Sequence, residues 1–186
     1  SPEANFRMVQ DVLLRQNRYD EALDIIDLFI AADPNNDRGP GFRQFVVDIR
    51  DRQKRIGELI AAIPPGQNPD IPVARELAAL YRDMGNTEAS VRLLLPCLSD
   101  PKLTVRDAYE IALALDALKA TAGAVQAIDI VMANLPGNAP ADLLLNIARI
   151  YANAQEPQKM ITPLTRYLRQ RPDDWQAWTD LATIYL

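Results

Sequence analysis

The chain has 186 residues and contains no histidine, a single cysteine and only 7 glycines. Histidine is the commonest general base and a frequent metal ligand, so its absence argues against most classes of enzyme. One cysteine, Cys97, allows neither an intrachain disulfide nor a paired-cysteine metal site. No glycine-rich phosphate loop or nucleophile elbow is present. We therefore predict that the chain is not an enzyme and binds no cofactor, metal ion or small-molecule substrate.

The sequence also lacks an apolar run near the roughly 20 residues that span a bilayer, and no signal peptide is visible. The formal net charge is −5, which disfavours a general role in nucleic-acid binding. We expect neither nucleic-acid binding nor membrane contact from this part of the protein.

The sequence does contain a period of 34 residues. Four spans of that length have similar residues at equivalent positions: Glu3–Asn36, Ile71–Thr104, Val105–Asn138 and Ala141–Asp174. The start of a fifth span follows at Trp175. A period of this size is typical of stacked helical hairpins, which usually serve as binding surfaces. We number the residues of each span from 1 to 34 and call these numbers places.

Equivalent places hold similar residues. Place 7 is apolar in Val9, Leu77, Ile111, Ile147 and Leu181. Place 8 is small in all but the first span: Gln10, Ala78, Ala112, Ala148 and Ala182. Place 11 holds Leu13, Tyr81, Leu115, Tyr151 and Tyr185. Place 20 is small in all but the last span: Ala22, Ser90, Ala124 and Met160. Place 24 holds Ile26, Leu94, Ile128 and Leu164, and place 32 holds Pro34, Pro136 and Pro172, with Pro101 one place early.

This pattern resembles the tetratricopeptide repeat, over about four-fifths of the chain. The resemblance implies an all-α fold: a right-handed solenoid of antiparallel helix pairs. Places 4, 7, 8 and 11 share one stripe of a helix because they are three and four residues apart. We expect the small residues at places 8 and 20 to face each other where the two helices of a pair approach closely. Place 27 faces the core in this family, so we expect the Cys97 thiol to be buried and inert.

Residues 37–70 fill one repeat length without the motif. Turn residues at 37–41 and a Pro-rich stretch at 64–70 enclose apolar residues at helical spacing. Phe42, Ile49, Ile56 and Ile63 recur every seven residues, which favours one long helix over 41–63. A degenerate hairpin is the alternative, but the charged run Arg50–Arg55 has neither Gly nor Asn where its turn would fall. That run is interpreted as a solvated face, with a docking site for an acidic partner as the alternative.

The domain organisation that we predict is therefore a first helix pair at 1–36, a long helix and linker at 37–70, three helix pairs at 71–174 and a terminal helix at 175–186. The chain begins at Ser1 rather than Met and ends at Leu186 inside a repeat, so we expect a piece of a longer protein. The sequence specifies no compartment. The cytoplasm is the default expectation, and a membrane-attached parent protein is the alternative.

In the family that this chain resembles, ligands contact the first helix of each pair, on the concave face. The matching places of this sequence give a candidate partner-binding set: Arg75, Arg82, Tyr109, Asn146, Arg149 and Asn153. The first span would add Arg7, Asp11 and Arg15. Members that bind heat-shock chaperones hold a terminal carboxylate with Lys, Asn and Arg, a set that this face matches only in part.

We predict a non-catalytic scaffold that binds a peptide or partner segment on its concave face. The alternative is a structural arm or self-association module of a larger protein, which would make contact through the long helix or the open end of the repeats.

Overall fold

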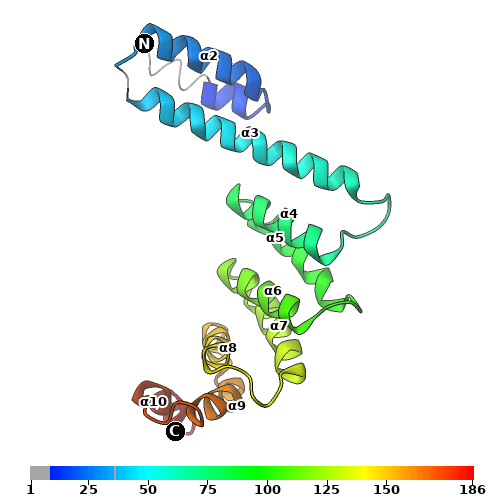
Figure 1. Cartoon of the computed structure of the whole chain (residues 1–186), viewed down its shortest axis with the longest axis vertical. Helices are drawn as coiled ribbons and strands as arrows, with labels where there is room; N and C mark the ends of the chain where they lie inside the picture. Colours follow the sequence, from blue (N-terminus) through cyan, green and yellow to red (C-terminus); the bar gives the residue numbers. More distant parts are fainter. Residues whose placement is uncertain (1–8, 36) are drawn as a thin grey trace. The chain divides into compact units, whose positions relative to one another are not determined.

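The structure is a computed structural model that describes residues 9–35 and 37–186. Within these ranges the chain is helical and contains no β-strand, as the all-α prediction requires. It divides into two compact units, Ser1–Asn68 and Pro69–Leu186 (Figure 1). The candidate contact Arg7 lies outside the described residues, as do the side chains of Gln10 and Asp11.

The second unit consists of three helix pairs followed by a single helix (Figure 1). The first pair is α4 (Ile71–Asp83) with α5 (Thr87–Leu94), and a 3₁₀ helix, η2 (Leu95–Ser99), extends α5. The second pair is α6 (Val105–Ala117) with α7 (Thr121–Asn134). The third is α8 (Ala141–Asn153) with α9 (Pro157–Leu168), and α10 (Trp175–Ile184) packs against α9. The first helix of each repeat thus begins at place 1.

Each of these pairs turns at place 15, where the backbone is left-handed. The φ angles are 77° at Gly85, 60° at Lys119 and 59° at Gln155, and Asn17 of the first unit has 57° at the same place. In all four turns the N–H of place 16 donates to the carbonyl of place 11, at 2.8 to 2.9 Å. The N–H of place 15 also donates to the carbonyl of place 12. This is the Schellman motif, which satisfies carbonyl groups at the end of the first helix and reverses the chain.

Small residues let the two helices of a pair approach closely, as the sequence predicts. Ala78, Ala112 and Ala148 at place 8 are all buried. At place 20, the buried hydroxyl of Ser90 donates to the carbonyl oxygen of Ala78 at 2.7 Å, so these two places are in direct contact. Met160, the large exception at place 20, packs against both of the apolar clusters of this unit.

Cys97 is buried, as expected from its place. Its thiol donates to the carbonyl of Leu93 at 3.4 Å, and burial raises the pKa of the thiol. A raised pKa keeps the sulfur protonated at neutral pH, which makes it a poor nucleophile.

The first unit contains η1 (Val9–Leu14), α2 (Tyr19–Ala32) and α3 (Arg38–Ala62). The described part of the first predicted helix is thus a short π-helix, whose turns are wider than those of an α-helix. The apolar side chains of η1, α2 and the first half of α3 form one cluster around Ala22, Ile26 and Val46.

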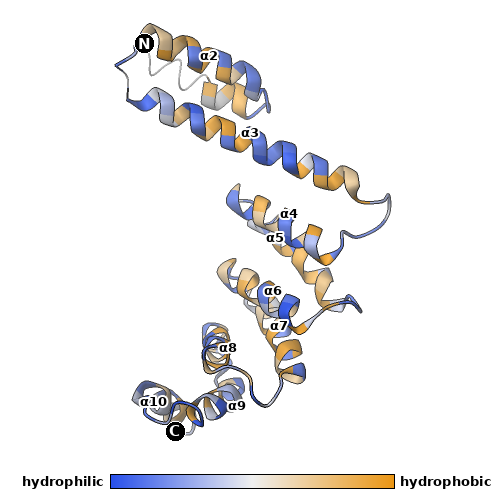
Figure 2. Cartoon of the chain, viewed as in Figure 1, coloured by the Kyte–Doolittle hydropathy of each residue, from blue (hydrophilic) through white to orange (hydrophobic). Residues whose placement is uncertain are grey.

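Residues 38–62 form one continuous helix of 25 residues, not a hairpin (Figure 1). The helix begins three residues earlier than the predicted 41–63, so the prediction of a turn over 37–41 was wrong for residues 38–41. The middle of α3 is hydrophilic (Figure 2), and its charges pair locally, as between Arg50 and Asp51. At about 1.5 Å per residue, α3 is roughly 37 Å long.

Candidate functional site

The first helices of the second unit, α4, α6, α8 and α10, share one side of their repeats, which we call the first-helix face. Two grooves lie on it, each between consecutive first helices. The α4–α6 groove is lined by Pro72, Arg75, Glu76, Ala78, Ala79, Arg82, Leu94, Glu110, Ala114 and Leu118. The α8–α10 groove is lined by Leu145, Ala148, Arg149, Ala152, Met160, Leu164, Asp174, Gln176, Ala177 and Asp180.

Six repeat places line both grooves. They are places 5, 8, 9 and 12 of one first helix, place 24 of its second helix and place 6 of the next first helix. The floor is apolar in both, with Ala78 and Leu94 in one groove and Ala148 and Leu164 in the other. The repeat therefore builds the same cavity twice, and the side chains at its rim make the two grooves different.

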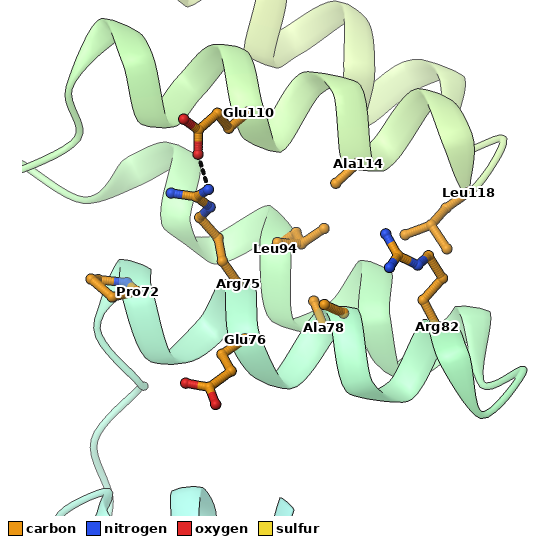
Figure 3. A pocket seen from close by; sticks show the side chains of 10 residues that line it. Pro72, Arg75, Glu76, Ala78, Arg82, Leu94, Glu110, Ala114 and Leu118 are labelled. Atoms are coloured by element: carbon orange, nitrogen blue, oxygen red, sulfur yellow. Dashed lines mark hydrogen bonds and ion pairs between the residues drawn. The ribbon is translucent and has the colours of Figure 1, made fainter. Parts of the chain in front are cut away.

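The α4–α6 groove has a volume of about 450 Å³. Arg75 crosses it from α4 to α6: its guanidinium donates to Asp107 at 3.2 Å and forms an ion pair with Glu110 (Figure 3). Glu110 also accepts from Arg106 at 2.8 Å. Arg75 is therefore neutralised by acidic residues of the neighbouring repeat, and it ties α4 to α6.

Arg82 is differently placed. Its guanidinium extends toward Leu118 over the apolar floor, whereas the carboxylate of Glu76 points away from it (Figure 3). The two bonds of Arg82, from Nε at 3.0 Å and Nη2 at 2.9 Å, both go to one oxygen of the adjacent Asp83. Both side chains are nearly half exposed, at 48% and 44%, and exposed pairs of this kind contribute only about 0–1 kcal/mol. Arg82 is therefore the cation that the groove presents to a ligand.

The middle of the face, between α6 and α8, is apolar with amides around it. Tyr109 is half-buried against the core, and Leu113 beside it is 41% exposed. The amide of Asn153 donates to both carboxylate oxygens of Asp116 at 3.2 Å, which links α8 to α6. An exposed leucine on this face offers a ligand an apolar contact.

The α8–α10 groove is smaller, about 240 Å³, and its rim carries two carboxylates. Asp180 accepts a hydrogen bond from the Gln176 amide at 2.9 Å. Asp174 accepts from the Tyr167 hydroxyl at 2.6 Å and from the N–H of Ala177, which caps α10. These hydrogen bonds, the one from Tyr167 first, lower the pKa of Asp174, so this carboxyl stays ionised at neutral pH.

Arg149 lines the same groove, and its guanidinium donates to the Asn146 amide oxygen at 3.4 Å. Over residues 9–35 and 37–186, neither Asp174, Asp180 nor Arg149 takes part in an ion pair. The groove thus holds two carboxylates and one guanidinium, whose hydrogen bonds go to neutral groups.

The candidate residues from the sequence fall into two classes in the structure. Arg75, Arg82 and Arg149 line grooves, while Tyr109, Asn146 and Asn153 lie between them on the same face. The six candidate residues include neither Leu113 nor the small and apolar residues of the groove floors. Leu113 occupies place 9 of the second helix pair, and Arg149 occupies place 9 of the third. The repeat places therefore identify Leu113 as a candidate contact when apolar residues are included.

A second polar cluster lies on the other side of the repeats. Asp129 of α7 accepts from the Tyr151 hydroxyl at 2.8 Å and from Lys159 at 2.7 Å, and the Lys159 ammonium lies 5.8 Å from the centre of the Tyr151 ring. Burial, followed by the bond to Asp129, raises the pKa of Tyr151 well above its usual value. All three groups contact one another across α7, α8 and α9, so the cluster fixes the packing of these helices.

In the part of the chain that the structure describes, no group of His, Cys, Asp and Glu side chains is arranged to hold a metal ion. Among the described helices, none combines the length and the apolarity needed to cross a bilayer.

No family model matches the chain, and no curated protein matches it. Solved structures are similar to it. A crystal structure of MamA protein has 14% sequence identity and a TM-score of 0.48, with 94% of each chain covered. YrrB, described as a TPR protein with an unusual peptide-binding site, has 14% identity and a TM-score of 0.47, with 96% of this chain and 98% of the other covered. A tetratricopeptide repeat protein from Parabacteroides merdae has 18% identity and a TM-score of 0.43, with coverage of 99% and 72%.

Proposed function

We propose that residues 69–186 form a non-catalytic protein-interaction module that holds an extended segment of a partner protein along the first-helix face. The observation that carries this proposal is the repeated groove: the same six places line an apolar-floored cavity between α4 and α6 and another between α8 and α10. Clefts with an apolar floor and a few polar groups at the rim are the usual form of a binding site. Leu113 supplies an exposed apolar contact between them.

The polar groups of the face suit recognition more than chemistry. They are guanidinium groups, carboxylates and amides, and the sequence offers no histidine as a general base. Bonds between first helices, such as those of Arg75 with Glu110 and of Asn153 with Asp116, fix the spacing of the grooves. A face of fixed spacing binds a ligand with less ordering cost than a mobile one.

The test is a selection of random 12-residue peptides on the immobilised 186-residue chain, followed by fluorescence anisotropy on the enriched peptides. We expect Leu113→Asp to weaken binding about tenfold or more, since it places a charge in the apolar middle of the face. Leu95→Asp is the matched control, because Leu95 has a similar exposure, 38%, and lines neither groove. Failure to enrich any peptide, or equal losses in the two variants, would contradict the proposal.

A second candidate is self-association through the first unit. It is supported by the large apolar side chains that this unit exposes, Phe45 and Ile60 on α3 and Leu28 on α2. Sedimentation equilibrium across micromolar concentrations tests it. A concentration-dependent mass that Phe45→Glu returns to that of a monomer would support self-association, and a chain that is monomeric throughout would exclude it.

A further inference from the structure

The two grooves of the first-helix face are equivalent in their repeat places but differ in the charged side chain that they leave available to a ligand: Arg82 in one and Asp180 in the other. We infer that the partner segment is bipolar: an acidic side chain enters the α4–α6 groove at Arg82, a basic side chain enters the α8–α10 groove at Asp180, and apolar residues between them cover Leu113. This inference deepens the proposed function and rests on it, since it names the chemistry of the segment that the same face would bind.

The acidic end of the segment is assigned by the geometry of Arg82. Arg75 is already neutralised by Asp107 and Glu110, and Glu76 points away from Arg82 (Figure 3). Arg82 engages only one oxygen of Asp83, through Nε and Nη2. Among the described residues, none accepts from its Nη1, so that nitrogen can donate to an incoming carboxylate. A charge-assisted bond of this kind is stronger than one between neutral groups.

The floor beside Arg82 adds an apolar contact. Ala114 in α6 and Leu118 just after it line the groove near the guanidinium, and Leu94 of α5 lies on its floor (Figure 3). In an extended segment, side chains two residues apart point to the same face and lie about 7 Å apart. An acidic residue at Arg82 and an apolar residue two positions away would thus enter the groove together.

The basic end of the segment is assigned by the α8–α10 groove. Asp180 and Asp174 accept hydrogen bonds from neutral donors only, and Arg149 donates to a neutral amide. The rim therefore carries one more negative than positive charge, above a floor of Leu145, Met160 and Leu164. A lysine or arginine side chain matches this arrangement, because its aliphatic stem packs on apolar surface while its charged head reaches a carboxylate.

Two charge reversals, each made singly in the whole chain, test the inference. With wild-type protein, selection from a random 12-residue peptide library should enrich peptides with acidic residues on one side of an apolar centre and basic residues on the other. Arg82→Glu should enrich peptides that are basic on both sides, and Asp180→Lys should enrich peptides that are acidic on both sides. The control is Arg92→Glu on α5, where an exposed arginine lies outside both grooves and the preference should stay that of the wild type.

The enriched wild-type peptide then serves as the probe in fluorescence anisotropy. Arg82→Glu should weaken its binding about tenfold, and a peptide whose acidic residues are replaced by lysine should regain that tenfold on the variant. If the variant regains binding only when the basic residues of the peptide are changed, the assignment of the acidic end to Arg82 is overturned. Peptides that bind without any charge pattern would overturn the bipolar segment and leave the proposed function standing, whereas an absence of binding peptides would overturn both.

Discussion

Residues 37–70 and residues 71–104 have equal length, yet one forms a single helix and the other a pair of helices. Both spans end with a residue that caps the following first helix: the side chain of Asp70 accepts from the N–H of Val73, and that of Thr104 accepts from the N–H of Asp107. The repeat boundary is therefore conserved between the two spans, while the hairpin inside it is not.

The difference lies at three places. In the regular pair, place 8 is Ala78 and place 20 is Ser90, which are in direct contact. Counted from Asp37, the same places hold Gln44 and Ile56, so neither place of this span has a small residue. Place 15 is the left-handed Gly85 in one span and the helical Asp51 in the other. The pair at 71–104 thus differs from the long helix in two respects: it has a turn that reverses the chain, and it has small residues at both places where its helices meet.

The largest expected effect comes from removing the apolar side chain at place 24. Ile128 is 0% exposed, while Ile60 at the same place of the long-helix span is 49% exposed. Ile128→Ala should lower the free energy of unfolding by about 2–5 kcal/mol, because it leaves a cavity in the core. Ile60→Ala should change it by less than about 0.5 kcal/mol. Urea denaturation followed by circular dichroism measures both, and similar losses would show that the two spans pack alike.

The next effect comes from enlarging place 8. Ala148→Leu should overpack the contact between α8 and α9 and cost about 1–3 kcal/mol of stability. Gln44→Leu adds an apolar side chain at the same place of α3, where the native residue is exposed and only bonds to Asp48. We expect a change below about 0.5 kcal/mol there. A neutral result for Ala148→Leu would mean that place 8 is not the close contact between these helices.

Changing place 15 to glycine should stabilise a span that forms a helix pair and destabilise the span that forms the long helix. Lys119→Gly should raise the midpoint of thermal unfolding and add about 0.5–1 kcal/mol to the free energy of unfolding, since lysine is strained at a φ of 60°. Asp51→Gly should cost about 0.5 kcal/mol, because glycine is the poorer helix former. If both changes destabilise, the left-handed turn is not the feature that separates the spans.

The smallest expected effect on stability comes from Asp174, the helix cap at place 34. The hydrogen bond from Tyr167, followed by the one from Ala177, holds the pKa of Asp174 below its ordinary value. The ionised carboxylate therefore stabilises the docked α10 fully above about pH 4, the ordinary range of an aspartate, and this stabilisation is lost as the pH falls through the lower folded pKa.

Trp175 and Trp178 are the only tryptophans of the chain and both lie in α10, so their fluorescence reports on this helix alone. We expect an acid transition in the fluorescence that Asp174→Asn removes. Asp70→Asn, which alters the equivalent cap of α4, should leave the transition in place. A transition that persists in Asp174→Asn would assign it to another group.

Much of the fold was readable from the sequence because the repeat supplies several copies of each signal. Places 7, 8 and 11 predicted the buried stripe of α6 and α8, and the seven-residue spacing of Phe42, Ile49 and Ile56 predicted a continuous helix. In α10 the residue at place 11, Tyr185, is 69% exposed. The left-handed residue at place 15 was not predicted, since only Asn17 and Gly85 are of residue types that favour this conformation. At Lys119 and Gln155 the packing of two helices imposes the conformation against local preference.

The sequence predicted which helix face carries the candidate site, but it did not predict the two grooves on that face. Counting places put Arg75, Arg82 and Arg149 on the first helices, and all three line grooves in the structure. Which of them is neutralised depends on the next repeat, about 34 residues away in sequence, where Asp107 and Glu110 meet Arg75. Side-chain pairing across that distance needs the geometry of the stacked helices, which a single sequence does not contain.

The turns at place 15 also bear on how quickly the chain folds. In α6 with α7, and in α8 with α9, the two helices are joined by only three residues, Leu118–Ala120 and Ala154–Glu156. Most contacts between elements are therefore made by neighbours along the chain, and closing such short loops costs little entropy. Proteins with contacts this local fold in microseconds to milliseconds. Each hairpin can serve as a starting point from which its neighbours are recruited in either direction.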